Sequence, residues 1–106
     1  MLITSTENVP GKRVTKVIGL VQGSTVRAKH VGRDIAAGLK GLVGGELSGY
    51  TELLVESRNQ SIQRMVQQAE KYGANAIVSV RFSTSAITPG ASELFCYGTA
   101  VVFQDE

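Results

Sequence analysis

The chain has 106 residues, of which 42% are hydrophobic and 19% are charged, and its formal net charge is +2. This length fits one domain, and no apolar run approaches the roughly 20 residues of a membrane-spanning helix. The single cysteine excludes an internal disulfide, and the N-terminus lacks the basic start and apolar middle of a signal peptide, so we expect a cytoplasmic protein.

The first part of the chain predicts two strands and a turn. Residues 1–5 form a short strand, and residues 8–11, Asn-Val-Pro-Gly, form a turn in which Pro and Gly favour the second and third positions. Residues 13–22 form a second strand, which we expect to continue over residues 24–29. Its apolar side chains lie on both faces, so a helix must cover one face and something else the other. Two glycines in this strand suggest a bulge or a close backbone approach: Gly19 and Gly23.

Two helices follow. Residues 31–43 have apolar side chains at helical spacing but contain interior glycines, each unfavourable by about 0.5–1 kcal/mol relative to Ala, so this short helix needs tertiary packing or is mobile. Residues 50–72 form a long amphipathic helix of about 35 Å, ended by Lys71 and Gly73. Its apolar arc, drawn at 100° per residue, consists of Tyr50, Leu54, Val55, Ser61, Ile62, Met65, Val66, Ala69 and Tyr72.

Arg58 projects from the middle of this apolar arc. An unpaired buried guanidinium costs several kcal/mol, so we expect Arg58 to be at least half buried and to bind backbone carbonyls or a carboxylate of its own or the next subunit. Its replacement by Ala should then cost about 3–5 kcal/mol, against well under about 1 kcal/mol for Arg64 on the flank. The candidate carboxylates are Asp34, Glu46 and Glu93.

The last part of the chain predicts a β-hairpin. Residues 76–86 alternate, with Val78, Val80 and Phe82 on one side, and residues 88–91, Thr-Pro-Gly-Ala, form a type II turn. Residues 93–103 form the final strand. The element order predicts one α+β domain over residues 1–106, in which the long helix and the short Gly-rich helix cover one face of a small antiparallel sheet. The other face is a candidate subunit interface.

Six stretches span nearly the whole chain in order: TSTENVPG at 4–11, GLVQG at 19–23, RDI at 33–35, GGELSGYTELL at 44–54, GANAIV at 73–78 and YGTAV at 97–101. Through these stretches the chain resembles the YbjQ-like family of small uncharacterised bacterial and archaeal proteins, which carries the label "putative heavy-metal-binding". The resemblance implies a dodecin-like subunit assembled into a ring, a pentamer, and implies no established activity.

Metal binding and catalysis find little support in the residue types. Soft metals need several converging thiolates or imidazoles, and the chain offers Cys96 and His30 as weak candidates that only a ring could gather across subunits. No Ser-His or Cys-His arrangement is visible. An enzyme with a carboxylate site at a subunit boundary, formed by Asp34 and Glu46, remains an alternative. No cofactor is expected.

A homo-oligomeric assembly or small-ligand-binding protein is therefore the preferred hypothesis. Residues 11–41 hold seven Lys and Arg against one Asp, whereas residues 42–106 hold four cations and seven anions. This asymmetry suits either an anion-binding face or complementary surfaces of neighbouring subunits. Basic residues without interleaved aromatics argue against nucleic acid. The polar candidates for a ligand pocket or a subunit interface are Arg33, Asp34, Glu46, Tyr50, Arg58 and Tyr97.

Overall fold

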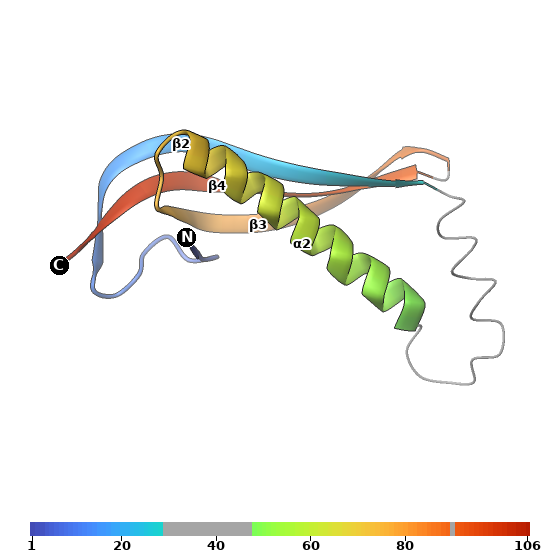
Figure 1. Ribbon diagram of the computed structural model, residues 1–106, viewed down its shortest axis with the longest axis horizontal. Helices are drawn as coiled ribbons and strands as arrows, with labels where there is room; N and C mark the ends of the chain where they lie inside the picture. The colour runs from blue at the N-terminus through green and yellow to red at the C-terminus, as the bar shows by residue number, and fades with distance from the viewer. Residues whose placement is uncertain (29–47, 90) are drawn as a thin grey trace.

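The computed structural model describes residues 1–28, 48–89 and 91–106 (Figure 1). In chain order its elements are β1 (Leu2–Ile3), β2 (Lys12–Ala28), α2 (Ser48–Lys71), β3 (Ala76–Thr88) and β4 (Ala91–Asp105). Four strands form one sheet in the order β1-β3-β4-β2, and α2 packs across one face of it. The α+β class is confirmed. The predicted helix at 31–43 lies outside the described residues.

The sheet is mixed rather than wholly antiparallel. The long strands β2, β3 and β4 pair antiparallel, as predicted, but β1 pairs parallel with β3. Beyond β1, the chain continues along the edge of β3, where the amide of Thr4 donates to the carbonyl of Ile77. The turn that follows has Pro10 and Gly11 in its central positions. Its hydrogen bond joins the amide of Lys12 to the carbonyl of Val9, and Gly11 has φ +80°, as a type II turn requires.

Strand β2 is one continuous strand that contains both of the features predicted at its glycines. Gly19 has φ +138° and lies at a register shift against β4, which confirms the bulge. Gly23 is the close backbone approach. A Cβ atom added there would lie 2.1 Å from the carbonyl oxygen of Ser61 and 2.5 Å from the amide nitrogen of Met65. The backbone of α2 therefore crosses β2 at Gly23, where any side chain would overlap it.

Helix α2 ends as the sequence predicts. Gly73 takes φ +84°, its amide donates to the carbonyl of Glu70, and the amide of Ala74 donates to the carbonyl of Ala69. These two bonds are those of a Schellman motif, which satisfies carbonyls at the end of a helix. The turn reverses the chain so that β3 starts directly beneath the last turns of α2 (Figure 1).

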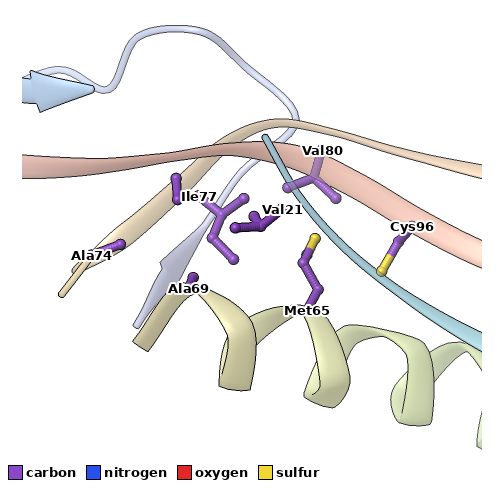
Figure 2. Close-up of a cluster of buried hydrophobic side chains, with 8 residues drawn as sticks. Val21, Met65, Ala69, Ala74, Ile77, Val80 and Cys96 are labelled. Atoms are coloured by element: carbon purple, nitrogen blue, oxygen red, sulfur yellow. The ribbon is translucent and has the colours of Figure 1, made fainter. Parts of the chain in front are cut away.

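The buried side chains form two clusters, one on each face of the sheet. The first lies between the sheet and α2 (Figure 2) and contains Val21, Met65, Ala69, Ala74, Ile77, Val80, Cys96 and Ala100. The second lies on the opposite face, where Val9 of the N-terminal loop packs against Ala76, Val78, Val101 and Phe103. The helix thus covers one side of the strand at 13–22, whereas on the other side the loop packs on β3 and β4 and leaves Val17 and Leu20 of β2 exposed.

The side chains of β3 do not alternate between the two faces as predicted. The alternation places Val78 and Val80 on the same side, but Val80 belongs to the cluster beneath α2 and Val78 to the opposite one. A bulge at Ser79 is the reason, since this residue has φ +54° and the register against β4 shifts between Val78 and Arg81. Gly98 on β4 makes room for it, because a Cβ atom there would lie 2.9 Å from the carbonyl oxygen of Val78.

No helix among residues 1–28, 48–89 and 91–106 is long and apolar enough to cross a membrane.

Replacing Gly23 with Ala should destabilise the protein by at least about 3 kcal/mol, because the new methyl group overlaps the backbone of α2 rather than a side chain that could move. Gly11→Ala is the matched control. A Cβ atom at Gly11 meets nothing within 4 Å, so only its positive φ is unfavourable, by about 1 kcal/mol. Urea unfolding measures both, and equal effects of the two variants would contradict the crossing.

Candidate functional site

The buried stripe of α2 is narrower and more polar than its apolar arc predicts. The side chains that face the sheet follow one another at four-residue spacing: Ser57, Ser61, Met65 and Ala69. The two serines face Thr25 of β2. The hydroxyl of Thr25 lies 3.1 Å from Ser61 Oγ and 3.1 Å from the carbonyl oxygen of Ser57, and Ser61 Oγ also lies within hydrogen-bond distance of the carbonyl of Leu94. These partners satisfy the buried hydroxyls, so this cluster stabilises the crossing and offers no unpaired group to a ligand.

Arg58 is exposed, so its predicted burial within the chain is wrong. The prediction took the whole apolar arc as buried, whereas small serines let α2 approach β2 along the stripe beside Arg58. Three residues of the arc, Leu54, Val55 and Tyr72, also lie in water, with 55%, 41% and 58% exposure. The expected effect of Arg58→Ala was derived from that burial and loses its basis within a single chain.

Arg64, assigned to the helix flank, makes the contact expected of Arg58. Its guanidinium donates to the carbonyl oxygen of Ser24, and one turn later the side-chain oxygen of Gln68 accepts from the amide of Gln22 at 2.7 Å. A helical wheel contains only the side chains of the helix, so it gives no information about the backbone amides and carbonyls of a neighbouring strand edge. The i, i+4 spacing of two long polar side chains above a glycine-containing strand is the signal that could have indicated these bonds.

The most prominent exposed surface is the face of the sheet opposite α2, which we call the open face. Side chains of directly paired residues share a face, and Val14, Val17 and Leu20 pair with Phe103, Val101 and Thr99 on the side opposite the helix. The two bulges of β2 keep these three residues on one face despite their three-residue spacing. Val17 is 64% exposed and Leu20 72%.

The open face continues toward the far end of the hairpin. Val26, 54% exposed, shares it with Phe95 and Tyr97, whose ring centroids lie 5.7 Å apart. Next to this aromatic pair, a shallow hollow is lined by Gln22, Gly23, Ser24, Glu93 and Phe95. The carboxylate of Glu93 in this hollow disfavours an anionic ligand by charge repulsion.

The remaining predicted site residues are only partly described. Arg33, Asp34, Glu46 and His30 lie outside the described residues, and Tyr50 lies within α2 without a described side chain. Of the pocket candidates whose side chains are described, Arg58 lies on the helix and Tyr97 on the open face, so they form no common site within one chain. A further exposed cation, Arg81, donates to the carbonyl oxygen of Ser5 and ties the N-terminal loop to β3.

Cys96 faces α2 and is fully buried (Figure 2). It pairs with Gly23, so it lies directly beside the point where the helix crosses the sheet. Burial raises the pKa of the thiol, against the opposing effect of backbone hydrogen bonds from Gly23 and from its own amide. The part of the chain that the structure describes contains no group of three His, Cys, Asp or Glu residues that could hold a metal ion.

Comparisons with known proteins identify relatives over nearly the whole chain. Residues 1–104 match the model of the YbjQ_1 family, described as "Putative heavy-metal-binding". A "UPF0145 protein" of Hahella chejuensis is 62% identical over 104 residues, covering 98% of this chain and 100% of the relative. Another, of Clostridioides difficile, is 57% identical over 106 residues and covers 100% of this chain and 95% of the relative.

A crystal structure shares the fold. It is that of a Pediococcus pentosaceus protein of unknown function from the DUF74 family, with a TM-score of 0.61 and 16% identity over 98% of each chain. At that identity the likeness supports the α+β architecture alone.

The location of Cys96 predicts that Cys96→Ser leaves the zinc or copper uptake of the purified protein unchanged, because one buried thiol cannot form a soft-metal site by itself. Metal content after dialysis, measured by mass spectrometry on both proteins, checks this. Stoichiometric uptake that disappears in the variant would contradict it.

Burial of Cys96 also predicts a pH dependence of stability. Since the pKa of the thiol is higher in the folded than in the unfolded protein, its stabilising contribution is complete below the unfolded value of 9.0 and is lost as the pH rises through the folded value. The free energy of unfolding of the wild type should therefore fall more steeply than that of Cys96→Ala above pH 9.0. Urea titrations across that range measure the difference, and parallel pH profiles would refute it.

Proposed function

This chain belongs to the YbjQ family, and we propose that it acts as a closed homo-oligomer, a pentamer, in which the open face of each sheet packs against a neighbouring subunit. The open face is the observation that supports this proposal. Scattered exposed apolar residues are normal on a monomer, but Val17, Leu20 and Val26 lie on one face, beside an aromatic pair. Burying each such side chain contributes about 1.5–3 kcal/mol.

A ring requires two different surfaces that fit one another, because the contact in a cyclic assembly is head-to-tail. The second surface in this proposal is the first half of α2, which carries the exposed Leu54 and Val55. The exposed acidic side chains of this second surface are Glu52 and Glu56. Arg13 and Lys16 of β2 pair with Gln104 and Val102 and therefore lie on the helix side of the sheet. The proposed contact with the open face thus depends on its apolar residues and not on pairing of opposite charges.

The alternatives depend on different residues. Heavy-metal binding, which the family description suggests, cannot use Cys96 across subunits, because this thiol faces α2 and not the open face. It would rely on other ligands gathered across subunits, such as His30, and a carboxylate enzyme site would need Asp34 and Glu46. A small anionic ligand at the subunit boundary remains part of the proposal through Arg33 and Arg58. We also propose a cytoplasmic location, since the one thiol of the chain is free.

Native mass spectrometry and light scattering test the assembly. We expect the wild type to form a closed oligomer of its 11.3 kDa subunit, and Leu20→Asp to weaken assembly by more than about tenfold, because the carboxylate would be desolvated at the contact. Gln67→Asp is the matched control, since it adds the same charge on the exposed side of α2. A well-folded wild-type monomer at micromolar concentration would refute the proposal.

A further inference from the structure

Among residues 1–28, 48–89 and 91–106, strand β2 has a long outer edge with no paired strand. It is the last strand in the order β1-β3-β4-β2, and β4 pairs with it along one side only. An unpaired edge offers a row of amides and carbonyls to any other strand, which makes it a site for self-association unless something blocks it. How this edge is blocked differs along its length.

The first half of β2 is protected by irregular geometry and charge. Register shifts occur between Val14 and Lys16 and between Val17 and Gly19, and such bulges twist an edge away from a flat partner. Three cations also lie in this half: Lys12, Arg13 and Lys16. From Leu20 to Ala28 the strand pairs with β4 in unbroken register. This regular stretch contains Arg27 as its one charged residue and no proline, a composition that favours strand pairing.

Helix α2 blocks this regular stretch. The amide of Gln22 points away from β4 and donates to the side chain of Gln68, and the carbonyl of Ser24 accepts from Arg64. Between them, Gly23 contacts the helix backbone. The two side chains thus occupy a donor and an acceptor on the edge, two residues apart, that another strand would use.

We propose that Arg64 and Gln68 close a latent strand-pairing surface on β2, whose occupant, once they are removed, is the same edge of a second copy of this chain. The stretch is self-complementary. In an antiparallel pair centred on Gly23, Leu20 lies opposite Val26 of the other copy and Gln22 lies opposite Ser24, so an apolar pair and a polar pair form. Val21 lies opposite Thr25, and both of these side chains are β-branched. Pairing of the same edge on two copies is a two-fold contact that joins two chains, so Arg64 and Gln68 keep this edge from adding a contact beyond those of the native assembly.

The test compares three variants by light scattering over a range of protein concentrations and by the infrared band of intermolecular antiparallel strands. Arg64→Ala combined with Gln68→Ala removes both side chains that block the strand edge. Gln63→Ala combined with Gln67→Ala is the control, since it truncates two exposed side chains of the same helix. Arg64→Lys combined with Gln68→Glu retains a donor and an acceptor at the capping positions. Only the variant with Arg64→Ala and Gln68→Ala should form species that are larger than the wild type and grow with protein concentration. The same variant should show the infrared band.

Hydrogen exchange at the Gln22 amide reports directly on its hydrogen bond to the side chain of Gln68. Its exchange should be faster by about tenfold in Gln68→Ala, a single change that removes one hydrogen bond, and unchanged in Gln67→Ala. If the variant with Arg64→Ala and Gln68→Ala is unfolded by circular dichroism, the oligomer size of the single variant Gln68→Ala tests the proposal instead. Faster exchange with the wild-type size distribution would overturn the proposal, whereas faster exchange with larger species supports it. The size of the wild type tests the ring separately, so the two proposals can fail independently.

Discussion

The close approach of α2 to β2 at Gly23 is the constraint on which the rest of the structure depends. Because this residue has no side chain, the helix backbone can lie against the strand, with Ser61 and Met65 directly above it. That contact sets the rotation of α2. It brings Ser57 and Ser61 onto Thr25, places Met65 and Ala69 in the core, and leaves the next side chains around the helix to reach over the strand edge.

The same constraint leaves much of the sheet uncovered by the part of the chain that the structure describes. Helix α2 contacts β2 most, β4 less and β3 little, so Phe82 on the helix side of β3 remains 47% exposed. Strand β2 is about 55 Å long at ~3.3 Å per residue, whereas α2 spans only about 36 Å. One helix fixed at one crossing point cannot cover a sheet of that length, and the N-terminal loop covers only one end of the opposite face. The uncovered surface is therefore a consequence of the architecture and not of a few stray side chains.

Sequence reasoning succeeded where a residue type determines the backbone and failed where packing does. Pro10-Gly11 placed a turn, Gly73 ended the helix, and Gly19 marked a bulge. The apolar residues on the second face of β2 called for a cover that the described residues do not supply, since Val17 and Leu20 are exposed. The bulge at Ser79 had no such signal, because serine rarely has positive φ. Arg58 was misplaced because apolar character defined the predicted buried arc. Contact with a glycine instead selected small residues for burial: Ser61, which the arc included, and Ser57, which it did not.

The crossing also bears on the metal chemistry that the family description suggests. Cys96 pairs with Gly23 across the sheet, so the helix that lies against the glycine also covers the thiol. A soft metal needs an accessible thiolate, and burial disfavours the thiolate here by raising the pKa of Cys96. Coordination through this sulfur would require α2 to leave the strand, with loss of the Thr25–Ser61 contact and of the core around Met65. The contact between α2 and β2 that stabilises the fold therefore keeps the Cys96 thiol, the softest potential ligand, away from metal ions. Metal binding in the folded chain would have to use other residues.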